Sequence, residues 1–257
     1  MILSRIIHHL KTQNWTAVAL EFVIVIAGVV IGFQVTAWNQ TREGEARGRG
    51  YLERIEADLT ADLASYDDRM AFWATVSDYG LRAISATHEE DRIAGVEQDW
   101  PIVLAFFQAS QVSEFNAIQT TYTEITSVGE LGLIDNLDLR EGLAKYYSLT
   151  GNFTLTERPA YRETVRGIIP IQLQLYIWEN CWSADFEGRQ VLTDCNPPED
   201  GAEISQTAST LLTDHDLHRQ LRYWVSTLQV LATMGRDRRG AAAFLLHAIE
   251  AERESAR

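Results

Sequence analysis

The sequence lacks the short motifs that mark the common catalytic and cofactor-binding sites. It contains no GxSxG, Walker, GxGxxG, HExxH or CxxC pattern. Its only two cysteines have no histidine partner in a recognisable catalytic signature. Carboxylates are so numerous that no pair stands out as an acid and a base. We therefore predict no cofactor and no catalytic residue, and an enzyme is the least supported function class.

Positive charge is scarce as well. Two lysines and twenty arginines face 36 acidic residues, and the formal net charge is −14. We attribute the shortage of lysine to genomic base composition. Residues 1–38 carry +1, so residues 39–257 carry −15. Such an acidic domain repels nucleic acid and anionic lipid headgroups, which excludes nucleic acid as a partner and leaves basic partners open.

The remaining composition is that of a folded, mainly α-helical protein. Hydrophobic residues make up 46% of the 257 residues, and 25 aromatic side chains can fill a sizeable core. Strand-like alternation is scarce. We predict an amphipathic segment at 1–14, a transmembrane anchor at 15–39 and an acidic extramembrane domain at 40–257. That domain is expected to fold as an irregular helical bundle.

The anchor is the strongest signal in the chain. Residues 16–38 hold one formal charge, Glu21, and about twenty apolar residues suffice to cross a bilayer. Trp15 and Trp38 bracket the segment about 34 Å apart along a helix, which places an indole at each interface. The alternatives are a cleaved signal peptide, for which Thr36 to Asn39 is a poor cleavage site, and a buried core helix.

The preceding residues 1–14 have apolar side chains on one helical face, which favours a short helix lying in the membrane interface. These residues are Ile2, Leu3, Ile6, Ile7 and Leu10. The alternative is a plain cytoplasmic stub.

One stripe of the anchor is polar or small. Glu21, Gly28, Gly32 and Asn39 recur at helical spacing on one face. The two glycines allow a second helix to approach closely, and a carboxylate within the span should face protein or the interface. We interpret the stripe as a contact face for self-association or for a partner helix. The alternative is that glycine is simply common in such helices and that Glu21 reaches the interface.

Flanking charge does not fix the orientation, because the C-terminal flank is the more basic one by count. Cysteine usage does favour one side. Cys181 and Cys195 bracket a polar, turn-rich excursion, and a disulfide there would stabilise the fold by about 3 kcal/mol. A disulfide indicates an oxidising compartment and therefore a periplasmic domain. Two free buried thiols in a cytosolic domain are the alternative.

Glycine and proline residues indicate where the helices of the domain begin and end. Residues 40–50 are either a flexible joint or a helix that continues, and 51–86 show helical periodicity. Pro101 is expected in the first turn of a helix that follows Asp99, and Pro170 should interrupt the helix that Pro159 opens. Further helices are predicted at about 116–128, 137–149 and 214–251, the last with a weak point at Gly235 and Gly240. The cysteine loop should span about 181–203.

Two blocks resemble a bacterial family of single-pass membrane proteins of unknown function. The first contains Glu21, Gly28, Gln34, Trp38 and Asn39. The second contains Tyr122, Ser127, Gly129, Leu133, Ile134, Leu139, Arg140, Tyr146 and Tyr147. The resemblance covers about a fifth of the chain and leaves out 151–257 with both cysteines. It implies the architecture and a bacterial inner-membrane location, and it implies no activity.

The second block also has a direct physical explanation. Gly129 ends one helix, a tight turn should bury Leu131, Leu133 and Ile134, and Asp135 or Asn136 caps the next helix. This helix-turn-helix chemistry requires no ligand.

Two histidine-containing segments are candidate metal sites. His215 and His218 share a helical face at a spacing that metals accept, but no third ligand is near, so we predict solvent-exposed residues. The acidic turn at 88–91 is expected to be a solvated loop. His247 is expected to be a core or interface residue. We therefore predict no metal site.

The leading functional hypothesis is a membrane-anchored interaction or scaffold protein, an accessory component of a membrane assembly. Its partners would be the lipid bilayer and a second membrane protein or another copy of the chain. The alternative is an extracytoplasmic, sensor-like domain that binds a small molecule. Four aromatic residues would line its pocket, although core packing is their commoner role: Tyr176, Trp178, Trp182 and Trp224.

Overall fold

The computed structural model describes residues 15–88, 95–113, 115, 117–148, 159–186, 188–199 and 201–255. The protein is mainly helical, as predicted. The elements are α2 (Trp15–Ala86), α3 (Val96–Gln108), α4 (Thr120–Ser127), the 3-10 turn η1 (Leu131–Leu133), α5 (Leu137–Ser148), α6 (Ala160–Ile168), α7 (Ile171–Asn180), β1 (Trp182–Ala184), β2 (Gln190–Leu192), α8 (Gly201–Thr213) and α9 (His215–Ser255). The predicted amphipathic segment at 1–14 lies outside the described residues.

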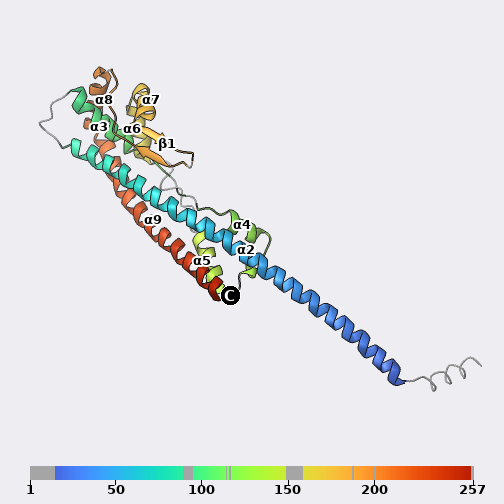
Figure 1. The fold of residues 1–257 in the computed structure, drawn as a ribbon. Coiled ribbons are helices and arrows are strands. Elements are labelled where there is room, and N and C mark those ends of the chain that lie inside the picture. Colours follow the sequence, from blue (N-terminus) through green and yellow to red (C-terminus); the bar gives the residue numbers. More distant parts are fainter. Residues whose placement is uncertain are drawn as a thin grey trace, which may run out of the picture.

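Helix α2 determines the shape of the molecule. It has 72 residues and is therefore about 108 Å long. Its C-terminal half packs along α9, and its N-terminal part projects away from every other labelled element (Figure 1). The helix is unbroken through 40–50, so this stretch continues the helix and is not a joint. The projecting part includes a strongly apolar window of 18 residues, none of them buried in the fold.

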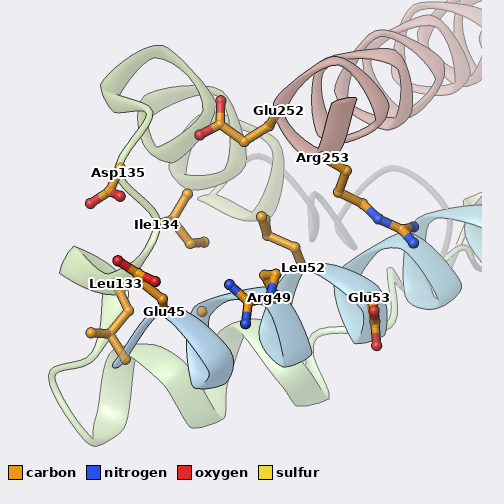
Figure 2. A pocket seen from close by; sticks show the side chains of 10 residues that line it. Glu45, Arg49, Leu52, Glu53, Leu133, Ile134, Asp135, Glu252 and Arg253 are labelled. Atoms are coloured by element: carbon orange, nitrogen blue, oxygen red, sulfur yellow. The ribbon is translucent and has the colours of Figure 1, made fainter. Parts of the chain in front are cut away.

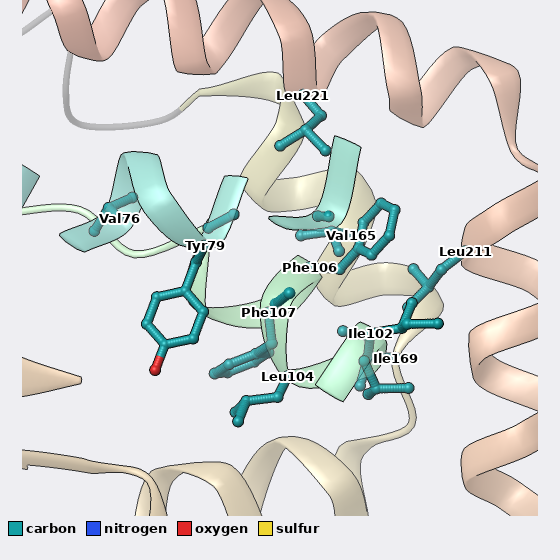
Figure 3. Packing of buried hydrophobic residues seen from close by; sticks show 14 of the residues in the cluster. Val76, Tyr79, Ile102, Leu104, Phe106, Phe107, Val165, Ile169, Leu211 and Leu221 are labelled. Carbon is teal, nitrogen blue, oxygen red and sulfur yellow. The ribbon is translucent and has the colours of Figure 1, made fainter. Parts of the chain in front are cut away.

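Two hydrophobic cores lie along the paired helices. The proximal core is nearer the projecting part of α2 and joins α2, α4, α5 and the end of α9. Its fully buried members include Ile55, Leu59, Ile125, Leu143 and Ile249. The distal core joins the other end of α2 to α3, α6, α7, α8 and the start of α9. There Phe106 and Phe107 of α3 lie among side chains of the surrounding helices (Figure 3).

Local signals explain several helix boundaries. Gly129 has φ +73°, the left-handed conformation that glycine adopts readily after a helix end. The Asn136 side chain accepts a hydrogen bond from the Leu139 N–H at 3.0 Å and so caps α5, as predicted. Pro159 directly precedes α6, and Pro170 separates α6 from α7, as expected of a residue without an N–H.

The turn within the same block is less buried than predicted. Ile134 is 1% exposed, whereas Leu131 and Leu133 are half-buried. Leu133 lies against α2, and its other side faces open space in the groove described below.

Three predicted boundaries were wrong, and the weak point expected in the last helix does not interrupt it. Helix α3 begins at Val96, so Pro101 lies inside it, and the buried Asp99 carboxylate accepts a hydrogen bond from the Gly95 N–H at 3.2 Å. Helix α4 begins at Thr120, later than expected. The region 181–203 contains the antiparallel β1–β2 hairpin and the start of α8. Helix α9 is continuous to Ser255.

The reason for this continuity is visible at Gly235. A Cβ there would lie 3.2 Å from atoms of Met70 and Trp73. The glycine therefore allows α9 to pack closely on α2, and tertiary contact outweighs its low helix propensity.

Candidate functional site

The predicted contact face lies on the projecting part of α2. Glu21, Gly28, Gly32 and Asn39 are all exposed. No described atom outside the helix's own backbone lies within 4 Å of a Cβ built at Gly28 or Gly32. Nothing in the described part of the chain therefore covers this face.

The predicted interface anchors stand at the two ends of the apolar stretch. Trp15 is the first residue of α2. Trp38 is 60% exposed, and the Arg42 guanidinium lies 4.9 Å from the centroid of its ring. A ring with an adjacent cation suits the boundary between hydrocarbon and water.

A second glycine pair, Gly44 and Gly48, lies one turn apart on α2, and sequence reasoning did not predict that another element packs on it. Both are buried, and both contact Leu133 of η1. A Cβ at Gly48 would lie 2.5 Å from the Leu133 carbonyl oxygen. This pair seats another element of the same chain, whereas the Gly28 and Gly32 pair has the same spacing and no such neighbour.

The groove beside this contact has a volume of about 480 Å³ and lies between α2, η1 and the end of α9 (Figure 2). Its rim carries charges of both signs. The charged residues are Glu45, Arg49, Glu53, Asp135, Glu252 and Arg253. Its first lining residue, Glu45, is seven residues beyond Trp38, so the groove opens close to the end of the apolar stretch.

Cys181 and Cys195 form a disulfide, with their Cα atoms 5.3 Å apart. It joins the end of α7 to the segment after β2. The backbone carbonyls of both cysteines also accept hydrogen bonds from side chains of α3. The Gln108 side chain donates to the Cys181 carbonyl at 2.8 Å, and the Trp100 indole donates to the Cys195 carbonyl at 2.7 Å. The crosslink thus belongs to the distal core.

The prediction that His218 is solvent-exposed was wrong, and of the two roles predicted for His247 the core role was wrong. His218 is 6% exposed and its Nε2 is 2.8 Å from the Leu211 carbonyl oxygen, because the first turn of α9 packs against the end of α8. His215 is exposed as predicted. His247 is not a core residue, since its side chain is 83% exposed and faces Glu250. Within the described residues no group of three potential ligands could hold a metal. Residues 89–91 of the acidic turn lie outside the described residues.

The four aromatic residues proposed to line a pocket take part in core packing. Trp224 is 2% exposed and donates to the Ala109 carbonyl at 2.8 Å. Trp178 and Trp182 pack edge to face with their ring centroids 5.0 Å apart, and Tyr176 packs on the distal core.

A buried carboxylate, which sequence reasoning also missed, lies in the proximal core. Asp62 is fully buried and accepts hydrogen bonds from the Tyr146 hydroxyl at 2.7 Å and from the Ile118 N–H at 3.0 Å. Burial raises the pKa of Asp62, although these two hydrogen bonds oppose the shift. Burial and the adjacent carboxylate also raise the pKa of Tyr146. The hydrogen bond between Asp62 and Tyr146 connects α2 to α5 within the otherwise apolar proximal core.

Arg162 and Arg166 form the second polar cluster that sequence reasoning missed. They lie one turn apart on α6, and both donate hydrogen bonds to Ser110, just after α3. No local pattern indicates this cluster, because α6 and its partner Ser110 are more than fifty residues apart in the sequence.

Scans of the chain against protein-family models, curated proteins and solved structures find no match. The resemblance of the two sequence blocks to a bacterial membrane family therefore remains a prediction.

Proposed function

We propose that this protein is a membrane-anchored scaffold that holds its acidic domain at a bacterial inner membrane and engages a membrane protein or a second copy of itself. The supporting observation is the bare apolar part of α2. It lies outside both cores, and its 18-residue apolar window is not buried at all. Exposing so much apolar surface to water is unfavourable, whereas lipid accommodates it.

The contact face supports a protein partner within the membrane. Gly28 and Gly32 leave a shallow surface, and Glu21 and Asn39 lie on the same face as these glycines. Polar groups in hydrocarbon are most stable when another helix satisfies them. Gly44 and Gly48 illustrate in the same helix how this spacing accepts a neighbouring element.

The disulfide supports a periplasmic domain, since bonded cysteines persist in oxidising compartments. Helix α2 also supports a scaffold role, because it enters the domain without interruption. The anchor therefore fixes both the height and the rotation of the domain. The alternative of a sensor that binds a ligand among the aromatic residues is weakened, because these residues pack together.

The test is crosslinking in native membranes followed by partner identification. We expect Glu21→Leu and Gly28→Leu to reduce the crosslinked product severalfold, because they fill or neutralise the contact face. Val30→Leu is the matched control, since it adds bulk on the opposite side of α2 and should leave the product unchanged. Recovery of only a monomer, with neither contact-face variant changing anything, would overturn the proposal.

A further inference from the structure

The arginine pair of α6 converges on the turn after α3. Arg162 donates from Nη1 to the Ser110 carbonyl at 2.6 Å. Arg166 donates from Nε to the Ser110 hydroxyl at 3.0 Å and from Nη2 to the Gln111 side-chain oxygen at 3.0 Å. Both arginine side chains are half-buried, while Ser110 and Gln111 are at most 1% exposed. Two cationic groups are therefore held within reach of one residue.

Neither arginine has a carboxylate partner among the described residues. Seven other arginines of the described chain do have one, even at exposed positions. These pairs are Arg47–Glu130, Arg54–Glu124, Arg82–Asp194, Arg189–Asp185, Arg219–Asp216, Arg239–Asp67 and Arg253–Glu56. In a chain with a net charge of −14, an unpaired and partly desolvated cation pair is conspicuous.

The protein groups that contact the pair do not balance its charge. The three acceptors are a carbonyl, a hydroxyl and an amide oxygen, all neutral. The C-terminus of α3 contributes the equivalent of roughly half a negative charge. Two guanidinium groups carry ten N–H donors, and three of these have acceptors in the described part of the chain. Positive charge and hydrogen-bonding capacity are both left over.

Aromatic rings hold one member of the pair in place. The Arg166 guanidinium lies 4.8 Å from the centroid of the Phe107 ring and 5.1 Å from that of Trp178. Burial and the charge of Arg162 lower the pKa of Arg166 to about 9. A bound anion would oppose this lowering of the pKa, because an opposite charge nearby favours the charged guanidinium.

We propose that Arg162 and Arg166 form a binding site for a small soluble anion that carries a carboxylate or phosphate group. A planar guanidinium matches the two oxygens of such groups with parallel hydrogen bonds. Contact with the rings and with the turn at 110–111 positions the Arg166 fork in advance, which reduces the entropy lost on binding.

The position of the site selects a soluble ligand over a lipid headgroup. The turn after α3 also contacts α2, where the Trp73 indole donates to the Ser113 carbonyl at 3.1 Å. Trp73 lies 35 residues beyond Trp38, which corresponds to about 50 Å along the helix. If Trp38 marks the interface, as the proposed function holds, headgroups of the same membrane cannot reach the pair.

The test uses the full chain in phosphatidylcholine nanodiscs. Its melting temperature is measured with sodium phosphate or sodium succinate and compared with sodium chloride at equal ionic strength. We expect at least one of the two anions to raise the Tm by about 5 °C at a concentration on the order of one hundred times Kd. Arg162→Gln and Arg166→Gln should each abolish the rise. Arg219→Gln, an exposed arginine on α9, should retain it.

A measurement on the wild-type chain keeps the proposal falsifiable if these variants do not fold. Titration with the same anions should shift the Nε–H nuclear magnetic resonance signals of Arg162 and Arg166. No rise in Tm and no shift with either anion would overturn the proposal, and so would an equal rise in both glutamine variants. A rise produced by phosphatidylglycerol nanodiscs alone, and lost in the variants, would overturn the soluble ligand in favour of a lipid. None of these readouts depends on the crosslinking partner.

Discussion

At the scale of the residue, the protonation of the buried Asp62 carboxyl group makes the stability of the proximal core depend on pH. Its pKa in the folded chain lies above the ordinary value of 3.8. The folded state therefore holds this proton over a pH range in which the unfolded chain has released it. As pH rises from 3.8 through the raised pKa, this group lowers the free energy of unfolding.

We predict that Asp62→Asn removes this loss of stability with rising pH. The asparagine stays neutral, and its oxygen can still accept from the Ile118 N–H. Urea unfolding at several pH values measures the effect. The control is Asp68→Asn at an exposed position of the same helix, which should keep the wild-type slope. Parallel pH profiles for wild type and Asp62→Asn would contradict the prediction.

Asp62→Ala should lower the free energy of unfolding by about 1–3 kcal/mol, because it leaves the Ile118 N–H without an acceptor.

Two glycines of α2 provide a second matched pair. A methyl group at Gly48 would meet the Leu133 carbonyl at 2.5 Å, whereas nothing lies within 4 Å of a Cβ at Gly50. We expect Gly48→Ala to destabilise the domain by about 1–3 kcal/mol through overpacking. Gly50→Ala should stabilise it by about 0.5–1 kcal/mol through helix propensity. Denaturant titration compares them, and equal effects of the two substitutions would show that η1 does not pack on α2.

At the scale of the element, α2 is one continuous helix that carries both the proposed contact face and part of the domain. Gln40 to Glu43 are exposed and lie between the two. Each residue inserted here turns the domain by about 100° relative to the contact face. The rotation can therefore be varied without touching either surface.

We predict that two alanines inserted after Gln40 abolish crosslinking to the partner, because they turn the domain by about 200°. Seven inserted alanines turn it by about 700°, which is about 20° short of two full turns, and should preserve the crosslink. The measurement is the crosslinking yield in native membranes. Similar yields for both insertions would mean that the partner contacts the anchor alone.

At the scale of the whole molecule, the disulfide and the continuous α2 support the proposal that the distal core lies far from the membrane on its oxidising side. We predict that a C-terminal fusion to alkaline phosphatase is active in intact cells and that a fusion to green fluorescent protein is dark. The reverse pattern would place the domain in the cytoplasm.

Replacing both cysteines with serine should cost about 3 kcal/mol in the free energy of unfolding, because the bond closes a loop with a sequence separation of 14 residues.

The sequence by itself predicted the mainly helical class, the apolar part of α2, the proline boundaries of α6 and α7, a cap on α5 from Asp135 or Asn136, and a disulfide as the favoured state of the two cysteines. These depend on local periodicity, on residues with restricted backbone conformations, or on there being only two thiols to pair. Spacing alone also places Glu21, Gly28, Gly32 and Asn39 on one side of one helix, and their role as a contact face stays a prediction.

Only the tertiary structure decided the features that depend on contacts between distant segments. It continued α9 past Gly235, because α2 packs closely there, and it buried His218 against α8. It joined Asp62 to Tyr146, and it brought Arg162 and Arg166 to Ser110 with no carboxylate of the described residues paired to them. Local periodicity cannot report such contacts, because burial and charge balance depend on which helices the fold brings side by side.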